Sequence, residues 1–238
     1  MQQPNQQLLQ QIYMPQQLQQ QQLNQQQAEH GMQQNNDHQH HQHVQPPVEN
    51  KTLILSDSMV GNIKNKDLNK HVNIHTDAAV IKKYPGQTAE EILDYTDSQL
   101  RKTKATQLII IAGSNDVSED HRKGILDAED ISAKILNIAR KAPKYGVQRI
   151  VVSGLFVRKT NTVITNCIKE VNRLLEKKCA DEGFIYMNQP DIVVGHLWRD
   201  NLHLNNYGLT ILKMNILQNF LSFNYDNCTF KSEYEEAL

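Results

Sequence analysis

The chain has 238 residues and a formal net charge of −1, and its composition changes sharply near residue 50. The first 50 residues contain about 20 Gln and no Lys or Arg, whereas the remaining 188 have ordinary globular composition and hold all 25 basic residues. With 23 of the 26 acidic residues, this second part has a net charge near +2, which lacks the basic excess typical of tight nucleic-acid binding.

The cysteines and the hydropathy pattern indicate where the protein resides. Cys167, Cys179 and Cys228 are too few and too scattered for a disulfide framework, and they favour a reducing compartment. We expect no secretory signal, because no basic segment followed by an apolar stretch opens the chain. We also expect no transmembrane helix, because no run approaches about 18 apolar residues. The predicted location is therefore the cytoplasm, with the nucleus as the alternative.

Residues 1–50 form a low-complexity tail rich in Gln and His. Polar tracts of this kind cannot bury enough apolar surface to offset the entropy of ordering, so the tail is predicted to be disordered. A short self-associating helix is the less favoured alternative. Four histidines could bind a metal adventitiously, but a polar tract without a specific ligand is the simpler interpretation: His38, His40, His41 and His43. Pro46-Pro47 marks the boundary with a folded domain at 51–222, and 223–238 is predicted to be a polar C-terminal tail.

Strands and helices are predicted to alternate through the folded domain. The predicted strands are 52–55, 78–84, 107–112, 148–152 and 184–187, and the predicted helices are 61–70, one opening at Thr88, 125–141, 162–180 and 206–221. Thr88 and Glu91 have the spacing of a capping box. Cys167 and Cys179 fall on the apolar face of their helix, which predicts small core residues. This alternation predicts a flavodoxin-like three-layer α/β/α sandwich around a parallel sheet of about five strands.

Four polar segments are predicted to meet at one edge of this sheet, because sites in such folds form at the carboxyl ends of the strands. The first strand runs into Ser58 at a strand-to-helix turn, where α/β folds expose reactive side chains. The later loops contribute Gly86, Gly113-Ser114-Asn115-Asp116 and Asp200-Asn201-Leu202-His203. A hydroxyl, a backbone amide, a carboxamide and a carboxylate–imidazole pair are the parts that acyl transfer needs.

Each of these residues also has a purely structural interpretation. Ser58 could cap a helix, Gly86 could form a turn after Pro85, and 113–116 could be a polar turn with a cap at Asn115 or Asp116. The pair in the last loop could be a surface charge and a loop histidine. Their joint occurrence in the expected loops and order favours the chemical interpretation. His196 is a competing candidate for the base, and Trp198 is predicted to be a packed residue rather than a pocket wall.

These segments resemble the sequence blocks of the SGNH/GDSL hydrolases over roughly residues 51–222. Ser56-Asp57-Ser58-Met59-Val60 resembles the Gly-Asp-Ser block, with Ser56 where the family commonly has Gly. Gly86 matches the second-block glycine, residues 113–116 match Gly-x-Asn-Asp, and residues 200–203 match Asp-x-x-His. Within the family the chain looks most like animal esterase domains, including those of some retrotransposon proteins.

The resemblance implies a serine esterase for acetyl or short-chain acyl esters that needs no metal or organic cofactor. Ser58 would be the nucleophile, His203 the base and Asp200 its orienting partner. The backbone N–H groups of Ser58 and Gly86 and the amide of Asn115 would bind the oxyanion. The alternative is a catalytically idle module of this fold that binds RNA or protein within a ribonucleoprotein. The retention of the catalytic residue types argues against it, and the sequence determines neither the natural ester nor the oligomeric state.

Overall fold

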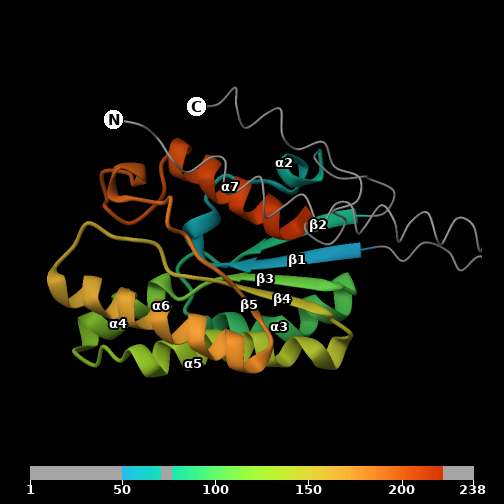
Figure 1. The fold of residues 1–238 in the computed structure, drawn as a ribbon, viewed down its shortest axis with the longest axis horizontal. Coiled ribbons are helices and arrows are strands. Elements are labelled where there is room, and N and C mark those ends of the chain that lie inside the picture. The colour runs from blue at the N-terminus through green and yellow to red at the C-terminus, as the bar shows by residue number, and fades with distance from the viewer. Residues whose placement is uncertain (1–49, 71–76, 222–238) are drawn as a thin grey trace, which may run out of the picture. The chain divides into compact units, whose positions relative to one another are not determined.

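The computed structural model describes residues 50–70 and 77–221 (Figure 1). The predictions for the Gln-rich tail, for Cys228 and for the C-terminal tail fall outside these residues. Within them, no helix has the length and apolar character needed to cross a bilayer.

Five parallel strands form one sheet in the order β2-β1-β3-β4-β5. The strands are β1 (Asn50–Ser56), β2 (Asp77–Lys83), β3 (Gln107–Ile111), β4 (Arg149–Ser153) and β5 (Ile185–Met187). The central strand β3 is buried along its whole length, as a parallel strand covered on both faces should be. The predicted α/β fold with a five-stranded parallel sheet is therefore confirmed, with strand bounds shifted by one or two residues.

Helices cover both faces of the sheet (Figure 1). α3 (Ala89–Thr103), α5 (Ala128–Lys141) and α6 (Thr162–Glu182) pack on one face, and α2 (Asn65–Asn69) and α7 (Asn206–Leu221) pack on the other. Successive strand residues alternate between the two cores: Leu108 and Ile110 face the first set of helices, whereas Ile109 faces the second. The two cores hold the strands rigidly up to their carboxyl ends.

Several local predictions were wrong. The short helix predicted at 61–70 is confined to Asn65–Asn69. Residues 113–116 were expected to lie in a loop after β3, but Ser114 already begins α4 (Ser114–Lys123), whose inward face is mostly polar. The helix predicted to start at Ile125 begins at Ala128, because Asp127 accepts hydrogen bonds from the N–H groups of the first turn. Ile125 precedes this cap and is 61% exposed. Cys179 is buried as predicted, whereas Cys167 is only partly buried.

Candidate active site

Ser58 lies directly beyond β1, as the first residue of the short 3-10 turn η1 (Ser58–Val60). β1 ends at Ser56, and the next residue, Asp57, accepts a hydrogen bond at its Oδ1 from the N–H of Met59 at 2.9 Å. Asp57 and not Ser58 is therefore the cap of this turn, and the structural interpretation of Ser58 as a cap is wrong. Met59 and Val60 are buried beneath the turn, so Ser58 is held at the edge of the sheet.

Asp200 and His203 lie in a tight loop between β5 and α7. The loop is closed by an antiparallel bridge between Leu197 and Leu204 and by a hydrogen bond from the N–H of Trp198 to the carbonyl of His203, at 2.8 Å. Asn201 at the tip has φ +60°, a conformation that asparagine tolerates better than most residues. This turn presents the two side chains on the same side.

A continuous chain of hydrogen bonds joins the three predicted catalytic side chains. His203 Nδ1 lies 2.8 Å from Asp200 Oδ2, and His203 Nε2 lies 3.0 Å from Ser58 Oγ. The backbone N–H of Leu202 and the side chain of His203 hold the pKa of Asp200 down, at about 2. An ionised carboxylate beside Nδ1 favours the proton on that nitrogen, which leaves Nε2 as the acceptor facing the serine hydroxyl. This arrangement can move a proton from Ser58 to His203.

The structure also brings together the loops that carry Asn115 and Gly86. Asn115 is the second residue of α4, and its Nδ2 donates to the backbone carbonyl of Gln87 at 2.8 Å. Gln87 follows Gly86, which has φ +78°, in the left-handed region that glycine adopts readily. One Nδ2 hydrogen of Asn115 remains for another acceptor. Within the described residues, the backbone N–H groups of Ser58 and Gly86 also donate to no acceptor.

Two buried carboxylates tie these loops to one another. The Oδ2 of Asp57 accepts from the N–H of Ser114 at 3.2 Å, and the Oδ2 of Asp116 accepts from the N–H of Ala89 at 2.8 Å. Asp57, which follows β1, therefore caps the start of α4, and Asp116, which lies in α4, caps the start of α3. The predicted cap at Asp116 is present, but it serves α3 and not its own helix.

Burial raises the pKa of Asp57 and that of Asp116 to about 6, although the hydrogen bonds from backbone N–H groups oppose the rise. Sequence reasoning missed both residues as parts of the site. The available signal was their position, since each adjoins a predicted site residue at the carboxyl end of a buried strand.

Positions 113 and 56, at this edge of the sheet, differ in whether they require glycine. A Cβ on Gly113, which has φ +108°, would lie 2.5 Å from Ile135 Cδ1, so this position requires glycine. Ser56 stands where the family commonly has Gly, and it is fully buried with its hydroxyl donating to the carbonyl of Asp57 at 3.1 Å. The site therefore accommodates this serine through an internal hydrogen bond.

Exposed apolar and aromatic side chains surround the loop that carries His203. Trp198 is 51% exposed and Tyr207 58% exposed, so the prediction of a packed tryptophan was wrong. The ring of His196 packs against that of Tyr207 in a tilted arrangement, with 4.8 Å between the ring centroids, and its Nδ1 accepts a hydrogen bond from the N–H of Val193 at 3.2 Å. Its ring is committed to these local contacts, so the geometry favours His203 over His196 as the partner of Ser58.

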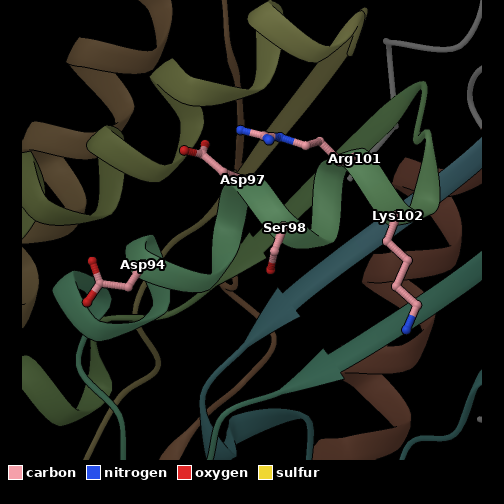
Figure 2. A pocket seen from close by; sticks show the side chains of 5 residues that line it. All are labelled: Asp94, Asp97, Ser98, Arg101 and Lys102. Carbon is pink, nitrogen blue, oxygen red and sulfur yellow. The ribbon is translucent and has the colours of Figure 1, made fainter.

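A hollow on the exposed side of α3 is separate from these loops (Figure 2). Its lining comes from one helix: Asp94, Asp97, Ser98, Arg101 and Lys102. Asp97 lies 3.5 Å from the Nζ of Lys141, and Arg101 lies over the ring of Tyr145, so these charges have structural partners. Elsewhere in the described part of the chain, no three His, Cys, Asp or Glu side chains are arranged to hold a metal ion.

No family model matches the chain, and no curated protein matches its sequence. Solved structures do match. A GDSL-like lipase from Bacteroides thetaiotaomicron aligns at 14% identity with a TM-score of 0.59, covering 73% of this chain and 88% of the lipase. A catalytic mutant of the acetylxylan esterase Axe2 from Geobacillus stearothermophilus aligns at 13% identity with a TM-score of 0.63, covering 74% and 95%. The fold is that of the SGNH hydrolases. The structure of TesA also aligns with this chain, at 17% identity and a TM-score of 0.57, covering 72% of this chain and 97% of TesA.

Identities this low show the shared fold alone. The catalytic mutants of Axe2 replace a serine, an aspartate and a histidine, and the last two lie three positions apart in its chain. The narrower likeness to animal and retrotransposon esterase domains stays a prediction.

Proposed function

We propose that the protein is a serine esterase that hydrolyses acetyl or other short-chain acyl esters. The observation that carries this proposal is the unbroken hydrogen-bond chain from Ser58 Oγ through both ring nitrogens of His203 to Asp200. A hydroxyl, an imidazole and a carboxylate in this order are the elements of nucleophilic acyl transfer.

In the proposed reaction, Ser58 Oγ attacks the ester carbonyl while His203 Nε2 takes the hydroxyl proton. The carbonyl oxygen becomes an oxyanion, which accepts hydrogen bonds from the N–H groups of Ser58 and Gly86 and from Asn115 Nδ2. His203 then gives its proton to the departing alcohol, and an acyl group remains on Ser58. A water molecule, deprotonated by His203, releases the acid and restores the serine. Asp200 holds the imidazole in place and stabilises its charged form throughout.

The fold supports ester hydrolysis in general. The structural neighbours include a GDSL-like lipase and an acetylxylan esterase, and catalytic mutants of the latter replace the same three residue types. The Asp–His spacing of three in that enzyme equals the spacing of Asp200 and His203. An RNA-binding module of the same fold has no use for this hydrogen-bonded arrangement, so we favour the esterase.

Removal of the nucleophile tests the proposal. Ser58→Ala should lower the hydrolysis of p-nitrophenyl acetate by at least about 10³-fold, because no other group would form the acyl-enzyme. A fluorophosphonate probe should label the wild type at Ser58 and fail to label His203→Ala. Ser98→Ala is the matched control, since this exposed serine on α3 bonds only to a carbonyl of its own helix. Unchanged turnover in Ser58→Ala, with retained helical circular dichroism, would rule out the mechanism.

A further inference from the structure

Arg158 lies in the segment between β4 and α6, and its guanidinium reaches the first turn of α4. Its Nη1 donates to Ser118 Oγ at 2.8 Å, and its Nη2 donates to the backbone carbonyl of Ser114. Ser118 Oγ in turn donates to the same carbonyl at 3.2 Å. The forked side chain thus binds two acceptors one helical turn apart, a geometry that a lysine cannot reproduce.

The backbone of Ser114 is held at both its N–H and its carbonyl. Its N–H donates to Asp57 Oδ2, and the carbonyl of the same residue accepts from Arg158. Asp57 immediately precedes Ser58, and Ser114 immediately precedes Asn115. The helix has no side-chain cap of its own, because its N-cap residue is Gly113. Asp57 and Arg158 therefore provide the side-chain contacts that fix this turn.

We infer that Arg158 is a positioning residue for the oxyanion site, acting on Asn115 through the carbonyl of Ser114. The inference rests on the proposed function, since it assigns Arg158 a part in that reaction. An oxyanion donor must be held within about 0.5 Å of its productive position, and a small displacement weakens the bond to the transition state more than the bond to the substrate.

The test compares single and double variants of the full chain with p-nitrophenyl acetate. Arg158→Met should lower kcat on the order of 10- to 100-fold and change KM by less than about 3-fold. The expected loss is smaller than that for removing an oxyanion donor entirely, which lowers kcat on the order of 10²–10³-fold. Arg158→Lys should retain more activity than Arg158→Met, since it keeps the charge and one donor. Arg122→Met is the matched control, because Arg122 is an exposed arginine on α4, the helix that Arg158 contacts. This variant should leave kcat unchanged.

The decisive comparison uses Asn115→Ala as a second background. If Arg158 acts through Asn115, Arg158→Met should cost less than about 3-fold once Asn115 is alanine, because the donor it positions is gone. An equal loss in both backgrounds, or an unchanged kcat in Arg158→Met, would overturn the inference. If Arg158→Met fails to fold, Arg158→Lys carries the same comparison. If the wild type does not hydrolyse the ester and Ser58 does not react with the probe, both the proposed function and this inference are overturned. If the wild type is active, the proposed function stands and the Arg158 variants test the inference alone.

Discussion

The carboxylate of Asp200 is oriented by backbone groups as much as by the histidine it serves. Its side chain is 50% exposed, and that of His203 is 41% exposed, so neither is held by burial. The N–H groups of Leu202 and His203 instead fix one carboxylate oxygen, at 2.9 Å and 3.0 Å, and leave the other for the ring. Because its pKa is about 2, Asp200 remains ionised across the pH range in which an imidazole can act as a base.

Asp200→Asn tests this orienting role. The amide cannot hold the proton on His203 Nδ1, so the ring loses the tautomer that faces Ser58 with a free Nε2. We expect kcat/KM for p-nitrophenyl acetate to fall on the order of 10²–10⁴-fold, with little change in the melting temperature. Asp191→Asn, at an exposed aspartate in the same inter-element segment, should behave as wild type. Activity above half of the wild-type level in Asp200→Asn would contradict the role.

At the scale of elements, the start of α4 depends on the glycine that precedes it. A side chain at position 113 would meet Ile135 and Leu155, whose atoms lie 2.5 Å and 3.0 Å from the added Cβ. The backbone there also has a positive φ, which costs a residue with a Cβ roughly 1–3 kcal/mol. The glycine therefore lets the helix begin close against α5, next to Asn115.

Gly113→Ala should lower the free energy of unfolding by on the order of 2–4 kcal/mol, since overpacking adds to the backbone strain. It should also lower kcat, because Asn115 lies two residues farther along. The matched control is Gly124→Ala at the other end of α4, where φ is +72° but an added Cβ meets nothing within 4 Å. Urea denaturation should give the smaller loss for Gly124→Ala, and equal losses would show that the contact with Ile135 is unimportant.

The elements that sequence reasoning predicted well are those with a strong apolar pattern. All five strands and the helices with a repeating apolar face follow from hydropathy alone, whereas α4 does not. Its inward face carries Ser114, Asp116 and Asp120. Ser114 and Asp116 bond to Asp57 and Ala89, which lie far away in the chain. The start of α5 was misplaced because Ile125 continues the apolar period although Asp127 caps the helix.

Among the candidate site residues, the meeting of Ser58, Asp200 and His203 could be predicted because they lie in short segments with recognisable spacing. The contacts of Arg158, Asp57 and Asp116 could not, because the partners of these side chains lie 27 to 57 positions away in the chain. The sequence thus predicts the groups of the proposed reaction better than the groups that hold them in place.

On the scale of the whole molecule, the buried carboxyls make stability depend on pH. Burial raises the pKa of Asp116 in the folded protein from its ordinary value of 3.8 to about 6. The folded protein therefore binds more protons than the unfolded chain between these values, so its stability falls as pH rises from about 4 to 6. Asp57, whose pKa is also raised by burial, likewise lowers the stability of the fold as pH rises through this range. The lowered pKa of Asp200 acts in the opposite direction, because its stabilising contribution is lost as pH falls below about 4.

Asp116→Asn isolates this effect, because asparagine keeps an acceptor for the N–H of Ala89 and cannot ionise. The free energy of unfolding of the wild type, taken relative to that of Asp116→Asn, should fall by on the order of 3 kcal/mol between pH 4 and pH 7. Urea denaturation at unit pH intervals measures the difference. Parallel pH profiles for the two proteins would show that Asp116 does not titrate in this range.

The two carboxylates that cap neighbouring helices also bear on the order in which the chain folds. An ordinary cap lies next to its helix in sequence and can form early, but Asp57 reaches α4 across 57 positions and Asp116 reaches α3 across 27. The bond of Asp57 requires β1 to lie beside β3, and the bond of Asp116 requires the start of α3 to lie beside the segment that follows β3. Such long-range contacts form only after the chain has closed large loops. We therefore expect partly folded forms with much of their helix already present to lack an ordered oxyanion site. Catalytic competence would be among the last properties that the folding chain acquires.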